Sequence, residues 1–102
     1  MSVRGPQGAT GRSIQSHVVF HGRVQGVGFR ASVCLHAEAI GLQGWVRNEL
    51  DGTVCMVVEG PPGPIDELIS RIQASFGVGL SEIDRQDAPA LNEFSGFRIL
   101  RA

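Results

Sequence analysis

Two helical stripes separated by strand-like runs constrain the fold of this chain more than any other feature. The first stripe consists of Phe29, Val33, Ala37 and Ile40. Its spacing predicts an amphipathic helix over residues 29–40, with Gly41 where glycine commonly ends a helix. The second stripe consists of Ile65, Leu68, Ile69, Ile72 and Phe76. It predicts a helix over residues 65–76, after the Gly-Pro-Pro-Gly-Pro break at 60–64.

Runs rich in β-branched and aromatic residues flank both helices. They predict strands from His17 onward and over residues 42–48, 53–59 and 94–100, with a hairpin at Asp51-Gly52. The mostly polar run at residues 81–87 predicts a further strand, at an edge of the sheet or half-exposed. The order is β-α-β-β-α-β with a short final strand, and right-handed crossovers place both helices on one face. We therefore predict an α+β, ferredoxin-like sandwich with an antiparallel sheet of four to five strands. The predicted core consists of Val19, Phe29, Val33, Ala37, Ile40, Val57, Leu68, Ile69 and Ile72.

The chain has 102 residues, enough for one domain whose core needs no metal or disulfide. Residues 1–16 are rich in Gly, Ser, Arg and Gln and offer little to bury. We interpret residues 1–16 as a flexible leader and 17–102 as the domain, which we expect to be a monomer.

The charge and the hydropathy of the chain argue against nucleic acid and membranes as partners. The formal net charge is −1, from 9 basic and 10 acidic residues, so nothing draws the whole molecule to nucleic acid or anionic lipid. No apolar run approaches the ~20 residues that span a bilayer. The N-terminus lacks the apolar core of a signal peptide, so we expect a cytoplasmic protein.

The metal-ligating residue types are few and scattered. Cys34 and Cys55 match no zinc motif and are expected to be free, buried thiols. His17 and His21 would share one face of a strand, where two ligands are conceivable, but surface histidines are the simpler interpretation. We expect no cluster of carboxylate, histidine or cysteine ligands, and therefore no metal and no cofactor.

The most informative stretch is GRVQGVGFR at residues 22–30, between the first strand and the first helix. Its glycines let successive N–H groups point into one concavity, and the helix adds unpaired N–H groups and its positive dipole end. Arg30 could close such a cradle around a phosphate with a bidentate contact. A plain tight turn explains the glycines equally well, because neither a Walker loop nor a dinucleotide motif is present.

Asn48 is a second candidate because it ends the strand over residues 42–48. Its side-chain amide can hold a water without acting as a base. Taken alone, an asparagine that shapes the hairpin turn is the favoured interpretation.

Together the two segments resemble a known family. GRVQGVGFR is similar to the first signature of the acylphosphatases, and GWVRNELDGTV at residues 44–54 is similar to the second. Their order and separation also match. The segments around residues 57–60 and 97–99 resemble later strands of the family, so the resemblance covers roughly residues 17–100.

The resemblance implies hydrolysis of the carboxyl–phosphate bond of acyl phosphates, giving a carboxylate and inorganic phosphate. It places the family's essential arginine on Arg30 and its essential asparagine on Asn48. The phosphate-binding amides fall on Gln25, Gly26, Val27, Gly28, Phe29 and Arg30. Gly28 and Glu49 stand where family members vary, and a Glu49 carboxylate turned inward would weaken substrate binding.

The implied chemistry needs no protein nucleophile, because a carboxylate is a good leaving group. Positioning and electrostatic stabilisation then suffice. The amides and Arg30 would stabilise the phosphoryl oxygens, and Asn48 would hold the water in line.

Two other functions remain to be weighed. A binding module could keep the cradle without turnover, as in the similar N-terminal domain of carbamoyl-transfer proteins of hydrogenase maturation. No zinc-finger cysteines follow here, so we expect the stand-alone enzyme. Ferredoxin-like sheets also bind RNA, but this sequence has no aromatic strand motif and no tyrosine, and its net charge is not basic.

Overall fold

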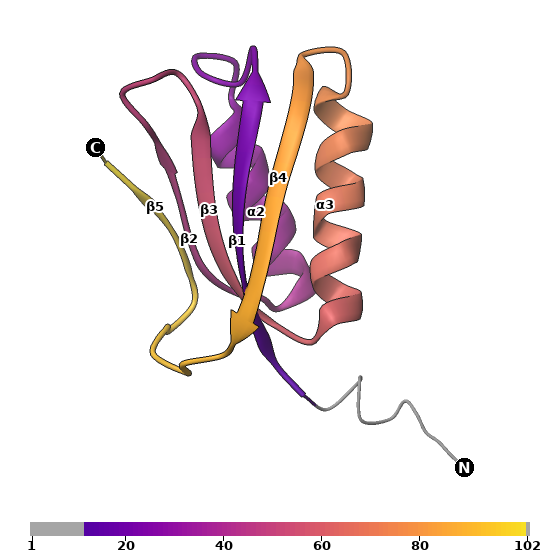
Figure 1. The fold of residues 1–102 in the computed structure, drawn as a ribbon, viewed down its shortest axis with the longest axis vertical. Helices are drawn as coiled ribbons and strands as arrows, with labels where there is room; N and C mark the ends of the chain where they lie inside the picture. The colour runs from indigo at the N-terminus through magenta and orange to yellow at the C-terminus, as the bar shows by residue number, and fades with distance from the viewer. Residues whose placement is uncertain (1–11, 102) are drawn as a thin grey trace.

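The alternation of strands and helices builds one sheet with both helices on the same face in the computed structural model, which describes residues 12–101 (Figure 1). In chain order the elements are β1 (Ile14–Gly22), α2 (Phe29–Ile40), β2 (Gln43–Asn48), β3 (Val54–Gly60), α3 (Pro62–Phe76), β4 (Leu80–Pro89) and β5 (Phe97–Leu100). The strand order across the sheet is β4-β1-β3-β2-β5. The predicted ferredoxin-like sandwich is therefore confirmed.

One strand runs in a direction that the sequence did not reveal. The β1, β2, β3 and β4 strands pair antiparallel to their neighbours, whereas β5 pairs parallel to β2. The reason is that the chain crosses from β4 to the opposite edge of the sheet and enters β5 at the end where β2 also begins (Figure 1). The fully antiparallel five-stranded sheet that we expected is wrong at this edge.

The first strand begins earlier than predicted. It starts at Ile14, three residues before His17, and both Gln15 and Ser16 are buried. Side-chain pairing permits this burial: Gln15 Nε2 donates to Glu59 Oε2 at 2.8 Å, and Ser16 Oγ donates to Asp87 Oδ1 at 2.6 Å. The sequence did not predict this part of the strand, because polar residues occupy its buried positions. Residues 1–11 of the predicted leader lie outside the described residues.

The core prediction is confirmed for the residues on the two helices. Phe29, Val33, Ala37, Leu68 and Ile72 are all buried in the cluster between helices and sheet. The two remaining helical members, Ile40 and Ile69, pack against its margin. Helical periodicity of 3.6 residues locates the buried face directly.

The prediction is less accurate for the strands. Val19 is only half-buried on the open face of the sheet, while its neighbours Val18 and Phe20 face the helices. Val57 is buried, but it lies outside the core cluster. In a run of consecutive apolar residues the sequence cannot reveal which alternate set faces inward, because a shift of one residue exchanges the two faces.

Within the part of the chain that the structure describes, neither helix is long and apolar enough to cross a membrane.

Gly44 is fixed by a close approach between strands and gives a test of the fold. Its φ is 142°, and a Cβ there would lie 2.0 Å from the Val57 carbonyl oxygen. We expect Gly44→Ala to lower the free energy of unfolding by more than about 2 kcal/mol, because the clash is with backbone. Chemical denaturation measures this.

Gly63→Ala is the matched control. Gly63 lies in α3, and a Cβ there would meet nothing within 4 Å. Its stability should be unchanged or slightly raised, since alanine favours a helix. Equal unfolding free energies for the two variants would contradict the strand register described here.

Candidate active site

A pocket of about 320 Å³ lies between the loop after β1, the start of α2 and the ends of β2 and β5. Its lining residues are Val24, Gly26, Gly28, Phe29, Arg30, Ala31, Asn48, Ile99 and Arg101. The fold thus brings the two sequence candidates, Arg30 and Asn48, to one cavity. The pocket unites residues from both segments that resemble the family signatures.

The loop before α2 takes a backbone conformation that needs glycine. Gly26 and Gly28 have φ values of 76° and 78°, in the left-handed region that residues with a Cβ rarely adopt. Gly28 is also the N-cap of α2 and offers no side chain to bond the first N–H groups of the helix. The peptide N–H groups of the glycine loop and of the first turn of α2 therefore have no local acceptor.

Seven consecutive N–H groups have no hydrogen-bond acceptor among the residues that the structure describes. The N–H groups on either side of this run are bonded: Val24 donates to the Gly22 carbonyl at 3.1 Å, and Ser32 donates to the Gly28 carbonyl at 3.1 Å. Within residues 12–101, no N–H group from Gln25 to Ala31 donates to a backbone or side-chain acceptor. Such a series of donors at a helix N-terminus is suited to an anion.

The start of α2 is held firmly by aromatic packing. The Phe29 ring lies 5.1 Å from the Phe20 ring and 4.9 Å from the Phe76 ring, measured between centroids. These contacts join β1, α2 and α3 beneath the pocket. Arg30 follows directly, is half-buried, and forms no ion pair with any carboxylate of the described residues.

Asn48 presents an acceptor that the protein itself does not use. It is the last residue of β2, two positions after the fully buried Val46, so it faces the helix side of the sheet. Its Oδ1 is buried without a hydrogen-bond partner, the one side-chain atom in this condition among the described residues. Buried polar atoms are nearly always paired, so an unpaired one in a pocket wall is suited to a ligand or a water.

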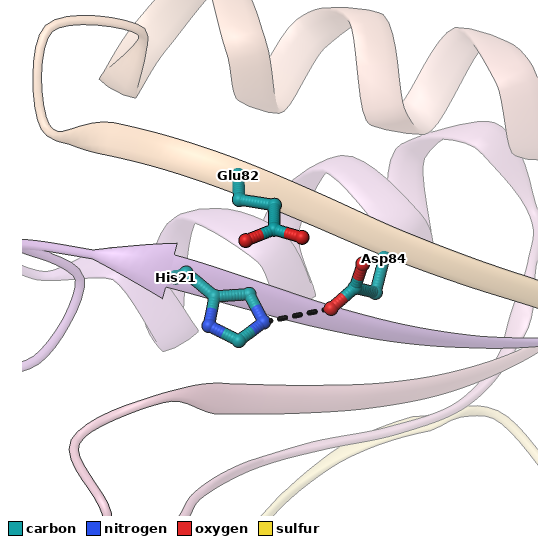
Figure 2. Close-up of side chains that lie close together, drawn as sticks. All are labelled: His21, Glu82 and Asp84. Atoms are coloured by element: carbon teal, nitrogen blue, oxygen red, sulfur yellow. Dashed lines mark hydrogen bonds and ion pairs between the residues drawn. The ribbon is translucent and has the colours of Figure 1, made fainter.

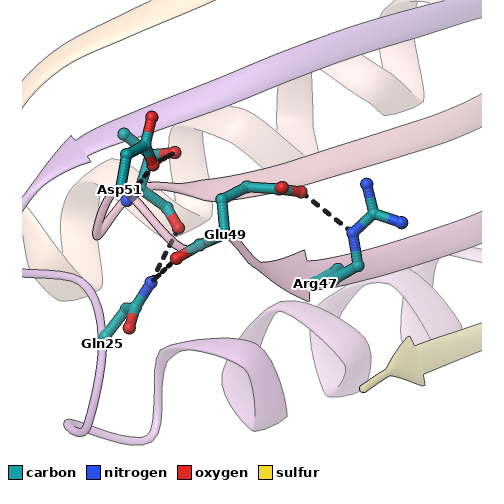
Figure 3. A network of polar contacts seen from close by, with 5 residues as sticks. Gln25, Arg47, Glu49 and Asp51 are labelled. Carbon is teal, nitrogen blue, oxygen red and sulfur yellow. Dashed lines mark hydrogen bonds and ion pairs between the residues drawn. The ribbon is translucent and has the colours of Figure 1, made fainter. Parts of the chain in front are cut away.

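Gln25 ties the loop to the β2–β3 hairpin (Figure 3). Its Nε2 donates to the Glu49 carbonyl at 2.8 Å and to the Thr53 carbonyl at 2.9 Å. Asp51 Oδ1 in turn accepts from Thr53 N at 3.0 Å and from Thr53 Oγ1 at 2.6 Å, which lowers the pKa of Asp51. The side chain of Gln25 therefore keeps the loop beside the end of β2 that carries Asn48.

Comparisons with known proteins agree with this geometry. The acylphosphatase family model matches residues 16–99. This chain belongs to the acylphosphatase family. The acylphosphatase of Rhizobium meliloti is 38% identical over 81 residues, which cover 78% of this chain and 85% of that protein. The crystal structure of the acylphosphatase from Bacillus subtilis matches with a TM-score of 0.78 at 30% identity, over 85% of this chain and 98% of that one.

As a member of this family, the protein is an enzyme that hydrolyses acyl phosphates to a carboxylate and inorganic phosphate. A structure of T. kodakarensis HypF also matches, with a TM-score of 0.72 and 28% identity. That match covers 83% of this chain but 11% of HypF.

Two of the predicted phosphate-binding residues do not line the acylphosphatase pocket. Gln25 is turned toward the hairpin, and Val27 borders a separate hollow of about 530 Å³ between the loop and the end of α3. The prediction concerned their backbone amides, which are unpaired, so their side chains need not enter the pocket. The bridging role of the Gln25 side chain was missed by sequence reasoning. The only signal for it was a long, uncharged polar residue in a glycine-rich loop.

Glu49, which stands next to Asn48, is turned away from the pocket (Figure 3). Its Oε2 accepts from Arg47 Nε at 2.9 Å, and the Arg47 guanidinium lies 4.8 Å from the centroid of the Trp45 ring. The inward carboxylate that the sequence raised as a concern is therefore not present. Arg47 is occupied by this pair and adds no free charge to the pocket.

Ile99 and Arg101 were not predicted as site residues, although both line the pocket. Their position depends on the parallel pairing of β5 with β2, in which Val46 lies opposite Ile99. No local pattern encodes that pairing, so the sequence carried no signal for them.

The expectation that no metal-ligating groups gather is wrong at one place. His21, Glu82 and Asp84 lie together on β1 and β4, with one ligand atom from each within 4.8 Å of the others (Figure 2). The pairing of β1 with β4 sets His21 opposite Glu82 and leaves its Nε2 2.9 Å from Asp84 Oδ2. The group lines no part of the acylphosphatase pocket.

Both cysteines are free, as expected, but each is only partly buried, so the expectation of buried thiols is wrong. Neither lines the pocket. Burial raises the pKa of the Cys34 and Cys55 thiols above its ordinary value, so both favour the neutral form. Neither thiol is prepared to act as a nucleophile.

Proposed function

We propose that acyl phosphates are hydrolysed in the pocket between the β1–α2 loop and the end of β2. In this proposal the loop N–H groups and Arg30 hold the phosphoryl group, and Asn48 positions the attacking water. The observation that carries the proposal is a run of seven N–H groups beside the Arg30 guanidinium, none of which has a partner among the described residues. Peptide N–H groups that converge in a loop and at a helix N-terminus are suited to a compact, multiply charged anion.

Stabilisation of developing charge is the main role of the loop. The transferring phosphoryl group spreads its charge over three equatorial oxygens, and donors fixed in advance need not reorganise when the reaction occurs. The aromatic packing of Phe29 and the Gln25 bonds to the hairpin fix these donors before substrate arrives. Arg30 adds a planar pair of donors that matches two phosphoryl oxygens.

Asn48 supplies an acceptor for one proton of the water. The amide oxygen is neutral and does not take that proton, so it orients the water and does not deprotonate it. We propose that the phosphoryl group of the substrate receives the proton as the water attacks phosphorus and the carboxylate leaves. This assignment needs no protein nucleophile, in keeping with the raised pKa of both thiols.

We further propose that the enzyme acts as a monomer in the cytoplasm, with no nucleic-acid partner. We also propose that the domain predicted at residues 17–102, extended to the start of β1 at Ile14, is its functional unit. The pocket is formed by one chain, with lining residues from Val24 to Arg101. Free cysteines suit a reducing compartment.

The first test is hydrolysis of benzoyl phosphate with and without EDTA. We expect equal rates, because the pocket lining formed by residues 12–101 contains no carboxylate side chain, histidine or cysteine. A rate abolished by EDTA and restored by a divalent ion would show that the metal-free mechanism is wrong. His21→Ala is the companion variant, since it removes the histidine of the cluster on the sheet face and should leave the rate unchanged.

Arg30→Ala should weaken phosphate binding as well as turnover. Each charge-assisted hydrogen bond contributes on the order of 1.5–3 kcal/mol, so losing a bidentate pair should raise the inhibition constant for phosphate well over tenfold. Arg71→Ala is a matched control, because Arg71 pairs with Glu67 on α3 and lines no part of the pocket. Unchanged inhibition by phosphate in Arg30→Ala would refute the role.

Asn48→Ala should lose turnover and keep phosphate affinity. An interaction made mainly in the transition state appears in kcat, and the expected loss is ~10²–10³. The melting temperature should stay close to that of the wild type, since Asn48 Oδ1 has no partner to lose among the described residues. A turn-shaping asparagine predicts the opposite pattern, with a lower melting temperature and activity retained. Measuring kcat, the phosphate inhibition constant and the melting temperature separates the two.

A further inference from the structure

We propose that Arg101 is a second cationic contact for the phosphoryl group, beside Arg30. The inference rests on the proposed function of the pocket and adds to it the residue that directly follows the last strand, β5. Arg101 lines the same cavity as Arg30 and Asn48.

The strand register brings Arg101 to this position. The β5 strand pairs parallel to β2, with Val46 opposite Ile99 and Arg47 opposite Leu100. Continuing that pairing by one residue sets Arg101 alongside Asn48. Side chains two apart share one face of a strand, and Ile99 also lines the pocket, so both observations place Arg101 on the pocket side.

The charge balance of the pocket supports the same role. Among the described residues, Arg30 and Arg101 are the charged members of its lining, and no carboxylate side chain stands beside them there. Three other arginines are already paired: Arg47 with Glu49, Arg71 with Glu67, and Arg85 with Asp66 and Asp87. Within residues 12–101, neither Arg30 nor Arg101 has such a partner. In a chain of net charge −1, two free guanidinium groups at one cavity form a local site for an anion of more than one charge.

The position of Arg101 also indicates which kinetic constant it governs. The side chain is exposed, so its attraction for phosphoryl oxygens acts in the bound substrate as much as in the transition state. Binding that is uniform in this sense changes KM and leaves kcat nearly unchanged. The attraction should also weaken as salt is added, because exposed charges are screened.

The protonation state of inorganic phosphate gives a second way to detect a contact from Arg101. Inorganic phosphate passes from a monoanion to a dianion as the pH rises through its second pKa. The Coulomb energy with a cation grows with the charge of the ligand. A contact from Arg101 therefore matters more for phosphate binding above that pKa than below it.

The test compares Arg101→Gln with Arg98→Gln. Both variants remove one positive charge from the C-terminal segment, but Arg98 borders a different hollow with Trp45 and Gly96. At low salt we expect Arg101→Gln to raise the dissociation constant for inorganic phosphate and KM for benzoyl phosphate about threefold to tenfold, with kcat within about twofold of wild type. The increase should shrink in high salt and below the second pKa of phosphate. Arg98→Gln should match wild type, and Arg101→Lys should recover most of the lost affinity.

The proposal is overturned if Arg101→Gln binds phosphate as tightly as Arg98→Gln, or if kcat falls while the phosphate dissociation constant is unchanged. Either result, obtained with a wild type that hydrolyses benzoyl phosphate, leaves the proposed function intact. Direct phosphate binding by calorimetry keeps the two questions apart. A wild type that binds phosphate but does not hydrolyse benzoyl phosphate would contradict the proposed function and leave the binding role of Arg101 open to the same comparison.

Discussion

The functional part of this molecule depends on seven peptide N–H groups that find no acceptor within residues 12–101. Leaving donors unpaired has a free-energy cost, and proteins tolerate it where a ligand or water completes the bonds. The loop bearing them cannot be stabilised by internal hydrogen bonds, because its donors must stay available. Contacts from outside the loop therefore hold it: the Gln25 side chain bonds to the hairpin, and the Phe29 ring packs between β1 and α3.

The sheet supports this loop by placing β1 between β3 and β4. A central strand has hydrogen-bonded neighbours on both sides, so its end is a rigid point from which the loop starts. The β2 and β5 strands, at the other side of β3, bring Asn48 and Arg101 to the opposite wall of the pocket. The loop contributes donors, and the strand ends contribute an acceptor and a charge.

The electrostatic character of the pocket arises from pairing elsewhere as much as from the pocket itself. The protein is nearly neutral, with 9 basic and 10 acidic residues. Ion pairs occupy Arg47, Arg71 and Arg85 on the surface, and Glu49 is turned toward Arg47 and not toward the site. Local positive charge thus results from arginines that the fold leaves without a carboxylate. Net charge alone gives no indication of such a site.

Local patterns in the sequence sufficed to predict the element types, the two helical faces of the core and the two segments that form the pocket. Those properties depend on neighbours a few residues apart, so the spacing of Phe29, Val33 and Ala37 or the glycines before Arg30 suffices to reveal them.

Other features of the core, the sheet and the site depend on how distant segments pack in three dimensions. It selected Val18 over Val19 for the core, set β5 parallel to β2, turned Gln25 to the hairpin and gathered His21 with Glu82 and Asp84. Each of these outcomes is fixed by which strands pair and in which register. That pairing joins residues far apart in the chain, and a local pattern of apolar and polar residues contains no record of it.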